Sequence, residues 1–170
     1  TLGYIAAPKT IYKNVMKLEP GHLLLVENSG QKLTLRRYWN VLENTIALSR
    51  EELPQKLRSM MFEAVKRRMV SDVPLGALLS GGLDSTLVTG IMSKLSSEKI
   101  KTFSIGFPDQ AVLDESTWAQ KAAAYYGTDH RQVAVSASDI RKCIPEILDN
   151  LGEPFSGGGS ILPTYLVSKI

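Results

Sequence analysis

The chain has 170 residues, of which 44% are hydrophobic and 22% are charged, as is typical of a folded globular protein and not of a disordered one. The formal net charge of +3 is small, and residues 66–68 form the only compact basic run, which argues against nucleic acid as a partner. No apolar run approaches the roughly 20 residues that span a bilayer, so no membrane segment is expected. The single cysteine, Cys143, excludes an intrachain disulfide framework and suits a reducing cytoplasm.

Residues 1–39 predict mainly extended structure. An apolar run at 23–26, turn residues at 28–30 and a second run at 32–37 favour a β-hairpin, which needs further chain to pack against. Residues 41–50 indicate a linker. A helix is then predicted, because Ser49 and Glu52 have the spacing of a capping box, although Pro54 is placed to delay its first regular turn.

The stretch at residues 75–85 organises the rest of the chain. An apolar run ends at Leu79, two adjacent glycines follow, and a helical pattern restarts at Leu83. The pattern predicts a buried parallel strand and its crossover helix, with an apolar row facing the sheet at Leu83, Leu87, Ile91 and Leu95. The turn between them is therefore expected at the carboxyl end of a strand, where open α/β sheets bind ligands.

The chemistry of this turn suits a polyphosphate. Gly81 and Gly82 allow backbone N–H groups to approach an anion closely, Ser80 and Ser85 add hydroxyls, and the helix start adds its dipole. Asp84 suits such a site if its carboxylate holds Mg2+ against the phosphates. The loop is not of the G-x-x-x-x-G-K-[ST] type, because Gly82 stands where that pattern has lysine.

The remainder alternates strand and helix. We predict strands at 99–107 and 131–135, a helix at 115–126, a helix from a Ser138 cap through Leu148, and another helix starting at Pro163. Glu115 and His130 lie near predicted strand ends, and we expect structural roles for both. The glycine-rich segment at 156–160 is given no site residue. The fold class is α/β, a doubly wound parallel sheet with helices on both faces, incomplete within this chain.

The run Ser80-Gly81-Gly82-Leu83-Asp84-Ser85 resembles the pyrophosphate-binding loop of the ATP pyrophosphatase superfamily, also called adenine nucleotide α-hydrolase-like. Its flanks at 73–79 and 102–107, together with the segments 114–116, 126–130 and 153–155, resemble glutamine-hydrolysing asparagine synthetase. Residues 8–12 and 17–22 resemble the end of that family's N-terminal glutaminase domain. The resemblance implies a glutaminase-like remnant at 1–40, a linker at 41–50 and the first part of a synthetase domain at 51–170.

The resemblance also implies a reaction. ATP would bind with its β- and γ-phosphates in the Ser80–Ser85 loop, which includes Leu83, and with Asp84 as a Mg2+ ligand. Leu78 and Ile105 match family positions that line the adenosine pocket. Aspartate would be adenylated on its side chain and then attacked by ammonia derived from glutamine. Small molecules are therefore the expected partners, in a cytoplasmic protein that forms a homodimer at full length.

Two features of the family are absent from these residues. No residue can act as the N-terminal cysteine that hydrolyses glutamine, and the family's second acidic, glycine-rich segment would follow Ile170. We therefore expect this piece alone to bind ATP weakly and to turn over little. The alternatives are a related amidotransferase or β-lactam-synthetase-like enzyme with another carboxylate acceptor, and a non-catalytic module. A tRNA-thiolating enzyme is disfavoured by the lack of a CxxC pair and of a strong basic patch.

Overall fold

The computed structural model describes residues 3–41, 47–109, 114–154 and 160–169, and it divides the chain into two units. Unit 1 comprises Thr1–Ala47 and Leu148–Gly158, and unit 2 comprises Leu48–Ile147 and Gly159–Ile170. The central part of the predicted linker (42–46) and most of the glycine-rich segment (155–159) lie outside the described residues. The sequence-based domain boundaries therefore stay a prediction.

Unit 2 is built on a parallel sheet of three strands, β3 (Gly76–Leu78), β4 (Lys101–Gly106) and β5 (Asp129–Ala134), in the order β3-β4-β5. Helix α2 (Leu83–Leu95) connects β3 to β4, and α3 (Ser116–Tyr126) connects β4 to β5. Helix α1 (Leu53–Arg68) precedes the sheet, while α4 (Ala137–Asn150) and α5 (Ile161–Val167) follow it. The predicted α/β class with a parallel sheet is confirmed.

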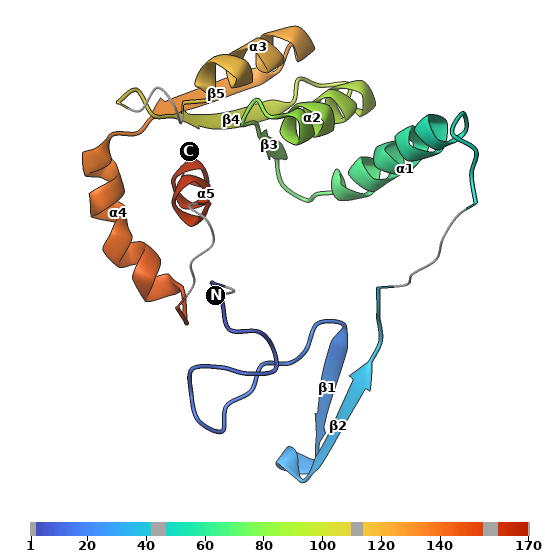
Figure 1. Ribbon diagram of the computed structural model, residues 1–170, viewed down its shortest axis with the longest axis vertical. Coiled ribbons are helices and arrows are strands. Elements are labelled where there is room, and N and C mark those ends of the chain that lie inside the picture. Colours follow the sequence, from blue (N-terminus) through green and yellow to red (C-terminus); the bar gives the residue numbers. More distant parts are fainter. Residues whose placement is uncertain (1–2, 42–46, 110–113, 155–159, 170) are drawn as a thin grey trace. The chain divides into compact units, whose positions relative to one another are not determined.

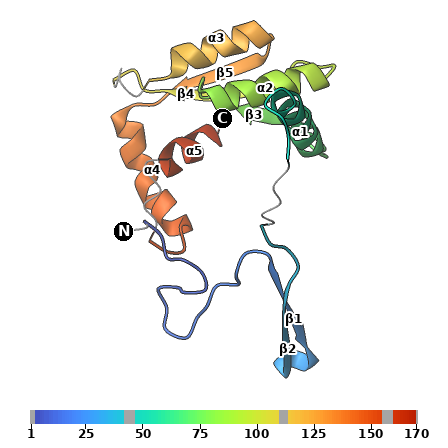
Figure 2. The same ribbon diagram turned by 45° about the vertical axis from the view of Figure 1, so that its right-hand side comes forward.

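Helices cover both faces of β4. Residues Thr102, Ser104 and Gly106 alternate onto the face covered by α3, where a β-carbon on Gly106 would lie 3.2 Å from the Ser116 Cβ. Phe103 and Ile105 point the other way and line a hollow with residues of α5. Figures 1 and 2 both show α3 and α5 on opposite sides of β4. Both helices thus reach the carboxyl edge of the sheet.

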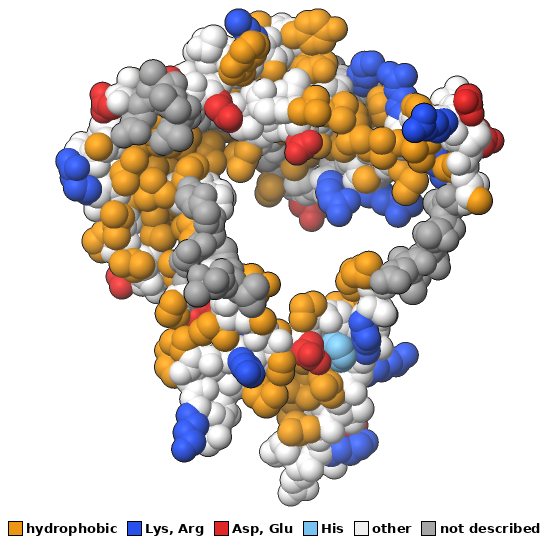
Figure 3. All heavy atoms as spheres, in the orientation of Figure 1, with side chains coloured by type: hydrophobic (Ala, Val, Ile, Leu, Met, Phe, Trp, Pro, Cys, Tyr) orange, Lys and Arg blue, Asp and Glu red, His pale blue; other side chains and the backbone are white. Residues whose placement is uncertain are grey.

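The apolar core of unit 2 has two parts. Val65, Ile91, Met92 and Ile100 form one cluster between α1, α2 and the sheet. Leu79, Ala119 and Ala123 form a second cluster where the end of β3 meets α3. Over α1 and α2, hydrophobic side chains remain on the surface (Figure 3), and Leu57 is 56% exposed there. No helix within the described residues has both the length and the apolar character needed to cross a bilayer.

The predicted buried row of α2 is confirmed at Ile91, which is 4% exposed, and is wrong at its three leucines. Leu83 is 83% exposed, and Leu87 and Leu95 are also exposed, whereas the four consecutive residues Thr89–Met92 are buried. A row of every fourth residue drifts by about 40° per step around a helix, so these leucines do not share one face. Burial is instead concentrated at the turn where α1 and α3 both flank the helix.

The capping box before α1 was predicted correctly, whereas the cap of α4 was not. The Ser49 N–H donates to Glu52 Oε2 over 3.0 Å and the Glu52 N–H donates to Ser49 Oγ over 3.2 Å, which is the reciprocal pairing of a capping box. Regular helix begins only at Leu53, with Pro54 in its first turn, which is the delay expected from Pro54. At α4 the cap is Ser136, whose Oγ accepts the Asp139 N–H over 3.2 Å, so Ser138 lies inside the helix.

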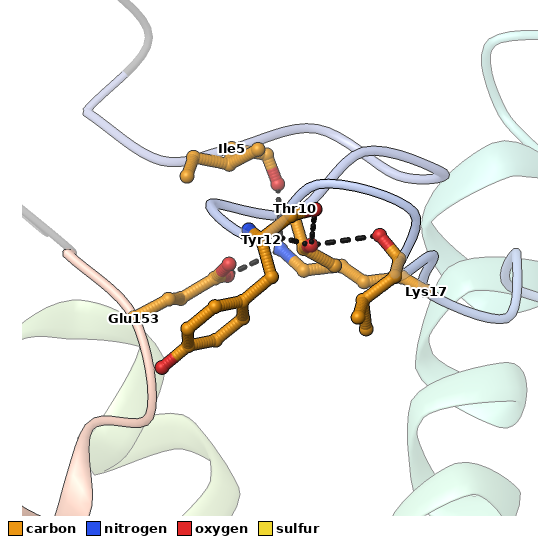
Figure 4. A network of polar contacts seen from close by, with 6 residues as sticks. Ile5, Thr10, Tyr12, Lys17 and Glu153 are labelled. Atoms are coloured by element: carbon orange, nitrogen blue, oxygen red, sulfur yellow. Dashed lines mark hydrogen bonds and ion pairs between the residues drawn. The ribbon is translucent and has the colours of Figure 1, made fainter.

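Unit 1 contains the predicted hairpin, with β1 (His22–Glu27) antiparallel to β2 (Lys32–Arg37) across a short turn, η1 (Asn28–Gly30). A polar network joins its two stretches of chain (Figure 4). Lys17 Nζ donates to the Ile5 carbonyl over 2.7 Å and pairs with the Glu153 carboxylate, with both side chains only partly exposed. This pair connects the N-terminal stretch to a segment more than a hundred residues later in the sequence.

His130 lies on the α3 face of the sheet among hydroxyl groups. Its Nδ1 is 2.9 Å from Thr102 Oγ1 and its Nε2 is 3.2 Å from Ser104 Oγ, while Thr102 Oγ1 is 2.8 Å from Thr128 Oγ1. A neutral imidazole donates at one nitrogen and accepts at the other, and hydroxyls can meet both needs. Burial disfavours the charged ring and lowers the pKa of His130 below its usual 6.5.

Acid should therefore destabilise unit 2 through His130. Below about pH 6.5 the unfolded chain binds a proton that the folded ring resists, so the free energy of unfolding should fall as pH drops from 7.5 to 5.5. Chemical denaturation at these pH values should show that the free energy of unfolding falls less with pH in His130→Gln than in wild type. The matched control is His22→Gln, which changes the other histidine of the chain. If the free energy of unfolding depends on pH equally in wild type and in His130→Gln, His130 is not the group through which acid destabilises unit 2.

Gly90 of α2 lies against Tyr126 of α3, and a β-carbon there would be 2.5 Å from Tyr126 Cζ. Alanine favours a helix over glycine by about 1 kcal/mol, but this overlap should reverse the sign. We expect Gly90→Ala to lower the free energy of unfolding by about 1–3 kcal/mol. Adding Tyr126→Leu should recover part of that loss relative to Tyr126→Leu alone. A more stable Gly90→Ala protein would show that the two helices do not approach this closely.

Candidate nucleotide-binding site

The predicted loop begins from a fixed point at the end of β3. Leu79 is 1% exposed, packs on Ala119 and Ala123, and donates its N–H to the Phe103 carbonyl over 2.8 Å. The chain then turns at Ser80 and Gly81 and enters α2 after Gly82. The predicted position of this loop, at the carboxyl end of a parallel strand, is thus the one observed.

Gly81 allows the loop to lie directly against α3. Its φ of +85° belongs to the left-handed region, which side-chain-bearing residues rarely adopt. A β-carbon at this position would lie 2.5 Å from the Ala119 backbone nitrogen and 2.6 Å from Trp118 Cβ. The second glycine differs, because Gly82 has a φ of −66° and a β-carbon there would meet only Ser80 Oγ, at 3.3 Å. The two glycines therefore serve different purposes.

The two serines of the motif close the loop. Ser80 Oγ lies 3.0 Å from Ser85 Oγ and accepts the Gly82 N–H over 3.2 Å, while the Ser85 hydroxyl can donate to the Gly82 carbonyl, also over 3.2 Å. The loop is thus bridged across its glycines by hydroxyls that lie on an exposed surface. Such a bridge fixes the shape of the turn and still leaves lone pairs and protons that an entering anion could use.

The first turn of α2 lacks a side-chain cap. Gly82 is its N-cap residue and has no side chain, so the first N–H groups of the helix point away from the helix body without a capping oxygen. In α4, by contrast, Ser136 Oγ satisfies the corresponding group. An uncapped helix start carries a partial positive charge and aligned donors, which together favour an anion.

Asp84 is the acidic residue in the first turn of α2, and its side chain is exposed. Within the described ranges, no group of three or more His, Cys, Asp or Glu side chains is placed to hold a metal ion. Mg2+ is commonly held by one or two carboxylates together with water and substrate phosphates. The single Asp84 carboxylate beside the exposed Ser80–Ser85 loop is compatible with a Mg2+ ion that would arrive with a nucleotide.

Two hollows meet at Leu78, whose side chain is 51% exposed. The first has a volume of about 210 Å3 and lies between the ends of β3 and β4 and helix α5; Leu78, Ser80, Ile105 and Glu115 are among its lining residues. The second, of about 620 Å3, lies between α1, α2 and the outer edge of β3, and both Asp84 and Ser85 line it. The smaller hollow offers apolar walls beside the loop, as an adenosine group would need.

The structure brings most of the predicted site residues to one edge of the sheet. Ser80, Gly81, Gly82, Asp84 and Ser85 form the loop and helix start, and Leu78 and Ile105 lie beside it. Leu83 is an exposed residue of α2 that lines neither hollow. His130 lies on the opposite face of the sheet from the smaller hollow, as its expected structural role requires.

The sequence analysis expected a structural role for Glu115 and assigned no site residue in α5, yet the structure places Glu115 and residues of α5 in the lining of the smaller hollow. Glu115 lines the smaller hollow, and Pro163, Thr164 and Val167 close it from the other side. In the sequence, the only indication that Glu115 lines this hollow is its position after a predicted strand. Its neighbour Asp114 is structural: its Oδ1 accepts the Ser116 N–H over 3.1 Å, and hydrogen bonds from Ser116 hold the pKa of that carboxyl below its usual value.

The chain is similar in sequence to several proteins of other organisms. It is 35% identical over 170 residues to a protein of Methanocaldococcus jannaschii provisionally named asparagine synthetase (glutamine-hydrolysing) 2, and this match covers 99% of the chain and 32% of the relative. It is 28% identical to asparagine synthetase (glutamine-hydrolysing) 1 of Bacillus subtilis, covering 98% of the chain and 26% of the relative. A protein of Penicillium rubens named amidase chyE is 32% identical over 71% of the chain and 20% of its own length.

The chain thus spans about a third or less of the length of these relatives. The family model described as asparagine synthase matches residues 56–170, which include the loop, the three parallel strands and every helix from α2 to α5. Because that match covers well over half of the chain, the protein belongs to the asparagine synthase family.

Proposed function

We propose that this chain is the ATP-binding part of a longer enzyme that converts aspartate to asparagine, with ammonia released from glutamine. The observation that carries the proposal is the uncapped start of α2 next to the Ser80–Ser85 loop, open to solvent beside an apolar hollow. The relatives named asparagine synthetase support the choice of reaction, and their names support glutamine as the ammonia source.

The reaction needs two steps. A carboxylate resists ammonia because its oxide is a poor leaving group, so the aspartate side chain first attacks the α-phosphorus of ATP. The bond to the bridging oxygen breaks, pyrophosphate leaves with the electron pair, and β-aspartyl-AMP remains. Ammonia then attacks the activated carbonyl carbon, AMP leaves, and a proton is lost. The first step accumulates negative charge on the departing pyrophosphate.

The loop residues would stabilise that charge. Backbone N–H groups of the α2 start would hold the β- and γ-phosphates, and the helix dipole contributes about 0.3–1 kcal/mol to an anion at this position. Ser80 and Ser85 would exchange their mutual hydrogen bond for bonds to phosphate oxygens. Asp84 would hold Mg2+, which when bound neutralises charge on the phosphates. Leu78 and Ile105 would flank the adenosine group. Catalysis is then mainly positioning and charge stabilisation.

The carboxylate that accepts the adenylyl group has a second candidate. The similarity to a protein named amidase favours, as a second candidate, a related amidotransferase that activates a carboxylate other than aspartate. Both candidates use the same loop for the same adenylation. Release of pyrophosphate by the full-length protein, measured with a panel of carboxylates with and without glutamine, separates them. Release that depends on aspartate and yields asparagine supports the first, and release with another carboxylate alone supports the second.

We also propose that the full-length protein forms a homodimer.

The two loop glycines should respond differently to alanine. Gly81→Ala places a methyl group against the α3 backbone at a positive φ, so we expect a loss of about 2–4 kcal/mol in unfolding free energy together with loss of ATP binding. Gly82→Ala meets only a serine hydroxyl, so it should fold within about 0.5 kcal/mol of wild type and bind ATP more weakly. Thermal unfolding and calorimetric titration with ATP test both. Equal stability of the two variants would contradict the contact with α3.

Asp84→Asn should abolish adenylation in the full-length protein. Removing the carboxylate leaves the fold intact but removes the expected Mg2+ ligand, so aspartate-dependent pyrophosphate release should fall at least about 100-fold. Glutamine hydrolysis should persist. Asp72→Asn, which changes another exposed aspartate outside the loop, is the matched control. Unchanged pyrophosphate release by Asp84→Asn would remove Asp84 from this role.

A further inference from the structure

The hollow of about 210 Å3 at the carboxyl edge of the sheet is asymmetric in polarity. Leu78, Ile105 and Val167 give it apolar walls, Ser80 lies at the loop, and Glu115 is the one acidic residue among the described residues that line it. Among the residues that the structure describes, none forms a hydrogen bond or ion pair with the Glu115 carboxylate. Glu115 is an exposed residue, so its carboxylate is solvated, and a ligand in the hollow would replace that water.

The position of Glu115 relative to the phosphate loop is fixed. Its backbone carbonyl accepts the Trp118 N–H over 3.0 Å and the Ala119 N–H over 3.2 Å, which makes it the anchor of the first turn of α3. The same turn lies against Gly81, because a β-carbon on that glycine would be 2.5 Å from the Ala119 nitrogen. The loop that would bind phosphates and the residue that carries the carboxylate therefore share one rigid contact.

The chemistry of the surroundings limits what this carboxylate can bind. A phosphate would be repelled by it, and an adenine ring would occupy the apolar walls instead. Between the phosphates and the base of a nucleotide lies the ribose, whose two neighbouring hydroxyls are hydrogen-bond donors. Acidic side chains bind ribose hydroxyls in the same way in dinucleotide-binding folds, where the carboxylate accepts their protons in hydrogen bonds.

We propose that Glu115 determines specificity for the ribose of ATP by accepting hydrogen bonds from its 2′ and 3′ hydroxyls. The inference rests on the proposed function, since it assumes that the hollow holds the adenosine group. Glu115, at the start of α3, would contact the ribose, whereas the Ser80–Ser85 loop would contact the phosphates. Glu115 is thus a specificity-determining residue, and it takes no part in bond making or breaking.

Nucleotide binding tests the inference without any turnover. Dissociation constants for ATP, 2′-deoxyATP and 3′-deoxyATP are measured by calorimetry on the full-length protein and on its Glu115→Gln and Glu98→Gln variants. Glu98 follows α2 at the amino ends of the strands and serves as the matched control. We expect wild type and Glu98→Gln to bind ATP about tenfold more tightly than either deoxynucleotide. Glu115→Gln should bind ATP at least about tenfold more weakly and should lose less affinity for the deoxynucleotides, because each of these has only one of the two hydroxyl contacts to lose.

The outcomes distinguish a failure of the ribose contact from a failure of the proposed function. Equal affinity of the wild-type protein for all three nucleotides overturns the ribose contact, whatever the variant does. A Glu115→Gln protein that keeps the wild-type preference also overturns it, as does one that loses the same factor for all three nucleotides, which would indicate a role toward the metal or the phosphates. A wild-type protein that binds no adenine nucleotide overturns the proposed function itself.

Discussion

The close approach of Gly81 to the backbone of α3 is the constraint on which the candidate site depends. Because no side chain intervenes, the turn after β3 lies against the first turn of the next crossover helix. This contact sets where α2 begins, how its open N–H groups are directed and how far Glu115 stands from the loop. Leu79 holds the near end of the turn in the core, so the exposed part has little freedom to relax. The proposed phosphate site would in this way be organised before its ligand binds.

Packing in the rest of unit 2 holds α2 and α3 in place at the carboxyl edge of the sheet. The interior face of β4 carries hydroxyls, and His130 satisfies two of them, so the space under α3 is filled by hydrogen-bonded polar groups as well as by alanines. Small residues let α3 lie close to the sheet, and Gly90 lets α2 lie close to α3. Close packing of this kind fixes the relative positions of helix ends more tightly than large, adaptable side chains do.

The sequence was most informative where local chemistry decides the structure. The capping pair Ser49 and Glu52, the hairpin turn and the paired glycines act within a few residues, and each was found where expected. The leucines of α2 were misjudged, because burial there is decided by which neighbours surround one turn and not by spacing alone. Glu115 could not be distinguished from His130 by its position in the sequence. Only the three-dimensional arrangement separates an exposed carboxylate that lines a hollow from an imidazole held by two hydroxyls.

The ion pair between Lys17 and Glu153 has a consequence for biosynthesis. Unit 1 is made of two stretches of chain, and about 100 residues of unit 2 are translated between them, which takes roughly 5–20 s at common elongation rates. During that interval the amine of Lys17 has left the ribosome while its acidic partner has not yet been made. The first part of unit 2 can therefore leave the ribosome while unit 1 is still incomplete, and a pause or truncation near residue 150 would leave the hairpin region without the segment that carries Glu153.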